Sequence, residues 1–74
     1  MTLIPRISGR EAVRAFGRMN YAVDHETGSH IILRQEGVPH RRLTIPDHHE
    51  IAKGTLRAII RHAGLTVDEF RDLL

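Results

Sequence analysis

The sequence contains no cysteine, so no disulfide bond can stabilise its fold. It also has no run of about 20 apolar residues, which is the length needed to span a bilayer. Its N-terminal residues lack the apolar stretch of a signal peptide. The missing cysteines are compatible with a reducing compartment. Together these absences predict a cytoplasmic protein with no membrane association.

Aromatic residues are scarce, since the chain has only Phe16, Tyr21 and Phe70. Both phenylalanines fit the apolar faces of predicted helices, so a platform of aromatic rings for stacking bases is not expected. The two serines do not lie in a Gly-x-Ser-x-Gly pattern, and no glycine-rich nucleotide-binding loop is present. These absences leave no constellation for acyl transfer or for binding a nucleoside triphosphate.

The length of 74 residues predicts one domain, residues 1–74, with a small core. Eleven Lys and Arg against nine Asp and Glu give a net charge of +2, a mild excess that does not by itself require nucleic acid. Six histidines raise the question of a metal site. No two of them are four residues apart and no cysteine accompanies them, so neither a metal nor another cofactor is expected.

The first helix is predicted to begin after Ser8, because Ser8 and Glu11 have the spacing of a capping box. Its apolar face would consist of Ala12, Val13 and Phe16. A second face carries arginines at four-residue spacing, namely Arg10, Arg14 and Arg18. This basic stripe is interpreted as an ordinary solvent-exposed surface.

Three strands are expected next, from Tyr21, over Ser29–Gln35 and over Arg41–Ile45, with turns at Thr27-Gly28 and Glu36–Pro39. Side chains alternate along a strand. If one sheet face packs on helices through Ile31, Leu33, Leu43 and Ile45, the opposite face must carry His30, Ile32 and Arg34.

The last part of the chain predicts a helix with its apolar face at Leu56, Ile59, Ile60 and Ala63, ending at Gly64. Thr66 and Glu69 form a second capping box for a short C-terminal helix. The predicted fold is therefore α+β, with the order α-β-β-β-α, a three-stranded antiparallel sheet with helices on one face, and the short last helix. This element order matches that of double-stranded-RNA-binding domains.

The sharpest local feature is Gly28-Ser29-His30 at the start of the second strand. Histidine can take up and release a proton near neutral pH, as RNA cleavage requires when a 2′-hydroxyl attacks the phosphorus and the 5′ oxygen departs. Arg34, on the same face, is a candidate donor to the phosphate. The alternative is a plain hairpin turn followed by a solvent-facing histidine, and the spacing alone favours that alternative.

A second candidate is the segment from Pro46 to Glu50 that leads into Lys53-Gly54-Thr55. Free amides at a helix N-terminus beside a lysine attract phosphate, and Lys53, Arg57 and Arg61 continue along that helix at four-residue spacing. The alternative is that Gly54 and Thr55 simply let a helix begin. His48 is a candidate for a second acid–base group or a phosphate contact, whereas His49 and Glu50 are equally well explained as ordinary surface residues.

Nearly the whole chain resembles the HicA (YcfA-like) toxins of toxin–antitoxin pairs. Four blocks agree in order and spacing with that family, at Pro5–Glu11, at Gly28–Arg34, at Leu43–Pro46 with His48, and at Gly54–Arg57 through Ala63–Leu65. The resemblance implies metal-free cleavage of mRNA by His30, which Gly28 and Ser29 position, and a HicB-type antitoxin that forms a hetero-oligomer with the toxin. Many members have a second histidine after the first, where this chain has Ile31.

The residues and the resemblance together predict an endoribonuclease toxin. His30 is assigned to catalysis, and RNA binding is assigned to Arg34, His48, Lys53, Thr55 and Arg57. Two other functions remain open at this point. One is an RNA-binding module without turnover, and the other is a domain that only binds a protein partner through its open sheet face.

Overall fold

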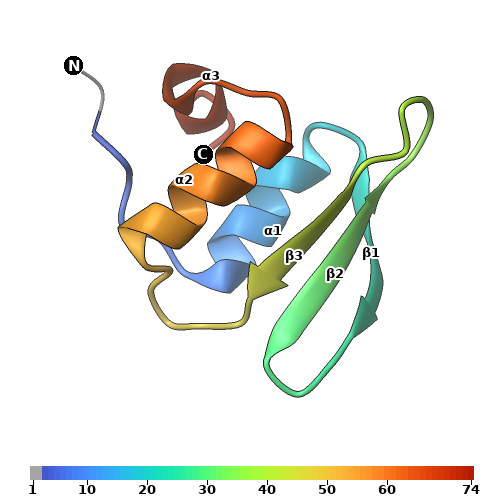
Figure 1. The fold of residues 1–74 in the computed structure, drawn as a ribbon, viewed down its shortest axis with the longest axis horizontal. Helices are drawn as coiled ribbons and strands as arrows, with labels where there is room; N and C mark the ends of the chain where they lie inside the picture. The colour runs from blue at the N-terminus through green and yellow to red at the C-terminus, as the bar shows by residue number, and fades with distance from the viewer. Residues whose placement is uncertain (1–2) are drawn as a thin grey trace.

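The computed structural model describes residues 3–74. Its elements are α1 (Gly9–Gly17), β1 (Tyr21–Glu26), β2 (His30–Gln35), β3 (Arg42–Pro46), α2 (Lys53–His62) and α3 (Val67–Arg71). The strands form one antiparallel sheet in the order β1-β2-β3, and the helices lie together on one side of it (Figure 1). The predicted α+β class and element order are therefore confirmed.

Local capping signals set the helix boundaries. In α1 the amide of Glu11 donates to Ser8 Oγ at 3.1 Å, and the amide of Ser8 donates to Glu11 Oε1 at 3.0 Å. Thr66 and Glu69 make the same reciprocal pair before α3. At the end of α2, Gly64 has a φ of +78°, which glycine adopts without steric cost. Both predicted capping boxes and the predicted helix end are confirmed.

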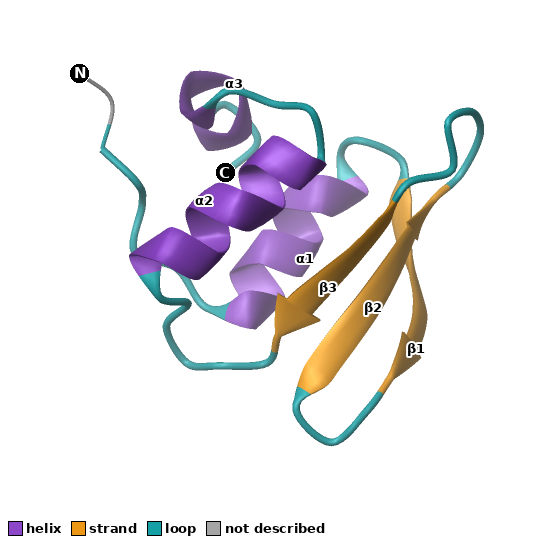
Figure 2. Ribbon diagram, in the orientation of Figure 1, coloured by secondary structure: helices purple, strands orange, loops and turns teal. Residues whose placement is uncertain are grey.

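The helices cover one face of the sheet and leave the other uncovered (Figure 2). Alternation of side chains along the strands gives the sheet a core face and an outer face. Ile31 lies opposite Ile45 and Leu33 lies opposite Leu43, and all four side chains are buried. They pack with the apolar faces of the helices, which include Phe16, Leu56, Ile60 and Phe70. The predicted core face is confirmed. The outer face carries His30 and Arg34, both exposed.

Three strand boundaries, in two strands, differ from the prediction by one residue. β2 begins at His30 instead of Ser29, and β3 covers Arg42–Pro46 instead of Arg41–Ile45. The carbonyl of Ser29 still accepts from the amide of Asp47, and that of Arg41 accepts from Gln35, both within 2.9 Å. Hydrogen bonding therefore extends past the regular strand conformation at these ends.

Tyr21 joins the two phenylalanines in the core. Its side chain is buried, and its ring contacts that of Phe16 edge to face, with centroids 5.6 Å apart. Burial also raises the pKa of the Tyr21 hydroxyl. The register of β1 then shifts between Val23 and His25. Val23 pairs with Leu33 before this shift, but its side chain is exposed, so Tyr21 is the buried residue of β1.

Candidate functional site

The turn between β1 and β2 fixes the backbone of His30. The amide of Thr27 donates to the His30 carbonyl at 2.9 Å, and the amide of His30 donates to Thr27 Oγ1 at 3.2 Å. No heavy atom outside the turn lies within 4 Å of the position that a Cβ would occupy on Gly28. The turn therefore holds the main chain of His30 while leaving open space beside it.

Ser29 orients the imidazole of His30. Ser29 Oγ lies 3.1 Å from His30 Nδ1, and both side chains are exposed. A hydroxyl both donates and accepts, so Ser29 can support either neutral tautomer of the ring. In the tautomer protonated at Nδ1, the other ring nitrogen, Nε2, can act as a base, and the imidazolium form of the ring can donate a proton from Nε2. The pair therefore provides the arrangement that a general acid–base group requires.

The outer sheet face carries two arginines at the end of β2 farther from the turn. Arg34 lies directly opposite Arg42 of β3, and both are exposed. The sequence indicated Arg34 but not Arg42, because the pairing of these two residues depends on the register between β2 and β3. Arg34 lies four residue steps along the strand from His30, which is roughly 13 Å at the usual rise. The structure thus places both on one face but does not bring them together.

Asp24 partly compensates the charge of this arginine pair. Its Oδ1 is 4.0 Å from Arg34 Nε, and its Oδ2 is 2.8 Å from His25 Nδ1. The hydrogen bond with His25 lowers the pKa of Asp24, and the charges of Arg34 and Arg42 act in the same direction. One carboxylate therefore faces two guanidinium groups, and this part of the surface keeps an excess of positive charge.

The loop that carries His48 lies beside the turn that carries His30. His30 is opposite Pro46 in the sheet, and the amide of Asp47 donates to the Ser29 carbonyl at 2.9 Å. The carbonyl of His48 in turn accepts from the amide of Gly9 at 2.9 Å, and the His48 side chain is exposed. The structure thus brings the two predicted histidine segments together, although they are far apart in the sequence.

The predicted phosphate-binding residues of α2 lie at its first turns. Lys53, Thr55 and Arg57 are all exposed, and Lys53 is the first residue of the helix. The N-cap residue is Ala52, which provides no side-chain hydrogen bond to the helix. The first amides of α2 therefore have no side-chain cap, unlike those of α1 and α3.

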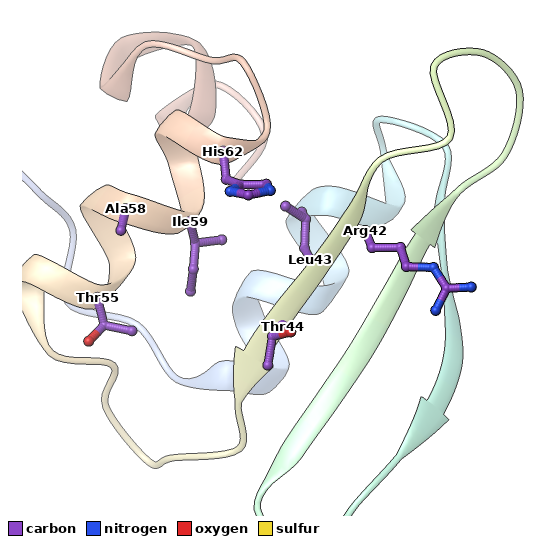
Figure 3. Close-up of a pocket in the computed structure, with 7 residues that line it drawn as sticks. All are labelled: Arg42, Leu43, Thr44, Thr55, Ala58, Ile59 and His62. Atoms are coloured by element: carbon purple, nitrogen blue, oxygen red, sulfur yellow. The ribbon is translucent and has the colours of Figure 1, made fainter.

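A shallow groove of about 260 Å³ runs between β3 and α2 (Figure 3). Its lining residues are Arg42, Leu43, Thr44, Thr55, Ala58, Ile59 and His62. Thr55 is the only predicted site residue among them, and the Arg42 side chain extends away from α2 toward β2. The groove is therefore separate from His30, whose site is formed by the outer face and the neighbouring turns.

A comparison with known protein families identifies the family of this chain. Residues 9–65 match the family described as the HicA toxin of bacterial toxin–antitoxin systems. The chain belongs to the HicA toxin family. The matched region contains all of the predicted site residues of this HicA chain, from Gly28 to Arg57. A search of curated proteins found no match to the chain.

Family membership makes this HicA chain the toxin of a toxin–antitoxin system, and such a toxin has an antitoxin as its partner. Within residues 3–74, no helix has the length and apolar character needed to cross a membrane. In the same part of the chain, no three side chains of His, Asp or Glu gather in a group that could hold a metal ion.

Proposed function

We propose that this HicA-family chain is an endoribonuclease that cleaves mRNA without a metal and uses His30 as its acid–base residue. The observation that carries the proposal is the hydrogen bond between Ser29 Oγ and His30 Nδ1, on an exposed face with an excess of arginine. The hydrogen bond engages one ring nitrogen, Nδ1, and leaves the acid–base role to the other, Nε2.

The reaction needs two proton transfers. The 2′-hydroxyl attacks the neighbouring phosphorus while Nε2 of His30 takes up the hydroxyl proton, and a bond between O2′ and phosphorus forms. The bond from phosphorus to the 5′ oxygen breaks, and this oxygen receives a proton. The products are a 2′,3′-cyclic phosphate and a 5′-hydroxyl. His48 is the proposed donor of the second proton, because its loop is hydrogen-bonded to the His30 turn.

The RNA backbone is proposed to follow the basic residues around His30. Arg34 is too far from His30 to hold the reacting phosphate, so it is assigned to a neighbouring phosphate, together with Arg42. Lys53, Thr55, Arg57 and the uncapped amides of α2 are assigned to a further segment of backbone. All three aromatic rings are buried, so stacking on bases is not part of this recognition.

The proposed partner of the toxin is a HicB-type antitoxin that forms a hetero-oligomer with it. Because the proposed substrate is mRNA, we assign the activity to the cytoplasm. Residues 1–74 are proposed to act as one toxin domain. An alternative function, RNA binding without turnover, would use the same basic residues and would not depend on His30.

The test is single-turnover cleavage of a structured RNA by the wild type and by His30→Ala, with melting curves and antitoxin binding for both. A general acid–base residue contributes about 10² to 10⁴ in rate, so the variant should lose cleavage while it keeps its fold, its RNA affinity and its antitoxin. Wild-type activity should survive addition of EDTA. Equal rates in equally folded proteins would remove His30 from the mechanism. If both proteins then cleaved RNA at the same rate, the result would point to His48. If neither cleaved RNA, it would favour RNA binding without turnover.

A further inference from the structure

Arg10 joins three segments of the chain around the candidate site. Its Nη2 lies 2.9 Å from Oε1 of Glu26, the last residue of β1, and 3.1 Å from Oδ2 of Asp47, the first residue after β3. The sequence placed Arg10 in a solvent-exposed basic stripe, and the structure confirms that Arg10, Arg14 and Arg18 are exposed. It also shows that one guanidinium nitrogen of Arg10 is shared between two carboxylates.

Both carboxylates border the turn that carries His30. Glu26 enters the turn directly before Thr27, and the backbone amide of Asp47 donates to the carbonyl of Ser29 at the other end. Ser29 then contacts His30 through its hydroxyl group. A continuous set of contacts therefore leads from Arg10, through Asp47 and Ser29, to the imidazole of His30.

The start of α1 is itself tied to the same loop. The amide of Gly9 donates to the carbonyl of His48 at 2.9 Å. A Cβ at Gly9 would overlap the carbonyl oxygen of Pro46, so only glycine permits this close approach. The helix that carries Arg10 is thereby held at a fixed place beside the loops of both histidines.

These contacts contribute little to global stability, because the side chains are largely open to solvent. Arg10 is 51% exposed, Glu26 46% and Asp47 35%. Ion pairs at such positions have small effects on unfolding. A fixed geometry is nevertheless valuable at a site where displacement of a catalytic group by about 1 Å can cost 10²-fold in rate. Catalysis should therefore be far more sensitive to Arg10 than folding is.

We infer that Arg10 is a positioning residue for the His30 site, and that its bridge between Glu26 and Asp47 sets the turn and the His48 loop relative to each other. The inference rests on the proposed RNA cleavage. Arg10 acts through the two carboxylates and does not itself touch the reacting phosphate.

The experiment compares Arg10→Ala with Arg14→Ala, which removes an equal charge from an exposed residue one turn further along α1. Arg10→Ala should lower the single-turnover rate about 10- to 100-fold, with the Kd for RNA within about twofold of that of Arg14→Ala. Arg10→Lys should restore part of the rate, because an ammonium keeps the charge but lacks the fork of the guanidinium. Arg10→Ala combined with Asp47→Asn should be no slower than Arg10→Ala alone.

A second measurement follows the free protein and needs no RNA. Hydrogen exchange of the Asp47 amide should be at least about 10-fold faster in Arg10→Ala than in Arg14→Ala, and the imidazole signals of His30 should shift. Unchanged exchange and unchanged signals would overturn the inference, as would equal cleavage rates for the two variants. A fall in RNA affinity that matches the fall in rate would make Arg10 an RNA contact instead. If His30→Ala cleaved like the wild type, the proposed function would fail, and the exchange data would still decide the role of Arg10.

Discussion

Arg34 and Arg42 lie directly opposite each other in β2 and β3, with both side chains exposed on the outer face. Like charges at directly opposed strand positions destabilise a sheet. The carboxylate of Asp24 approaches Arg34 at 4.0 Å and offsets only part of the repulsion. An arrangement with this cost is expected where an anionic ligand uses both charges, and the proposed RNA backbone is such a ligand.

Arg42→Gln should therefore weaken RNA binding without weakening the fold. Loss of one phosphate contact should reduce the slope of log K against log salt by about 0.7 to 0.9. Relief of the repulsion should leave the free energy of unfolding unchanged or raise it by up to about 0.5 kcal/mol. Binding titrations at several salt concentrations and urea unfolding measure the two effects. Wild-type affinity in a less stable variant would show that Arg42 serves the sheet rather than RNA.

Lys53 and Arg57 provide the second proposed contact with RNA. Replacing both with alanine should reduce the salt slope by about 1.4 to 1.8, since two phosphate contacts would be lost. Alanine has the highest helix propensity, so α2 should remain folded. Circular dichroism checks the helix, and Arg14→Ala measures the effect of removing a positive charge elsewhere. A double variant that kept the wild-type affinity and slope would show that the RNA surface has been misplaced.

Gly9→Ala should destabilise the protein by about 1 to 3 kcal/mol, because the added methyl group overlaps the carbonyl oxygen of Pro46. The matched control is Gly17→Ala at the other end of α1, where no heavy atom beyond the neighbouring residues and the helix's own backbone lies within 4 Å of the new Cβ. That change should be neutral or stabilise by up to about 1 kcal/mol. Thermal unfolding of both variants tests the pair. Equal stabilities would contradict the close approach of α1 to the end of β3.

The sequence was most informative where the signal is local. A capping box is read within four residues, and both the Ser8–Glu11 and Thr66–Glu69 boxes form as predicted. Alternation within β2 and β3 likewise identified the core face, because a side chain that faces helices must be apolar. These same local rules placed His30 and Arg34 on the outer face.

The rest of the site depends on contacts between distant segments. Arg10 is 16 residues from Glu26 and 37 from Asp47, and neither spacing has a helical or strand period. Ile4, Ile7 and Ile51 are core residues in segments without regular structure, where no periodic pattern marks burial. Predicting the Arg34–Arg42 pair requires knowing which residue of β3 lies opposite each residue of β2. Such features follow from the packing of elements, which a single sequence does not specify.

The capping box of α1 should give the stability a measurable dependence on pH. Hydrogen bonds from Ser8, chiefly from its amide, lower the pKa of Glu11 below its ordinary value of 4.5. A carboxylate whose pKa is lower in the folded state stabilises it above pH 4.5, and this contribution is lost as pH falls through the folded value. Glu11→Gln should therefore flatten the decline of stability below pH 4.5, relative to the wild type and to Glu36→Gln in an exposed turn. Parallel declines in all three proteins would contradict this role of Glu11.

Ser29 offers the most direct test of how the imidazole is held. Ser29→Ala removes the hydroxyl group that lies 3.1 Å from Nδ1 of His30, while the backbone hydrogen bond from Asp47 to residue 29 does not depend on the side chain. We expect the single-turnover rate to fall about 10-fold, less than the 10² to 10⁴ expected for loss of the acid–base group itself. The affinity for RNA should not change, and Ser29→Thr should keep much of the rate because it retains a hydroxyl group. Since Ser29 acts through His30, adding Ser29→Ala to His30→Ala should cause no further loss. An additional loss in the double variant would mean that Ser29 contacts the substrate independently of the histidine.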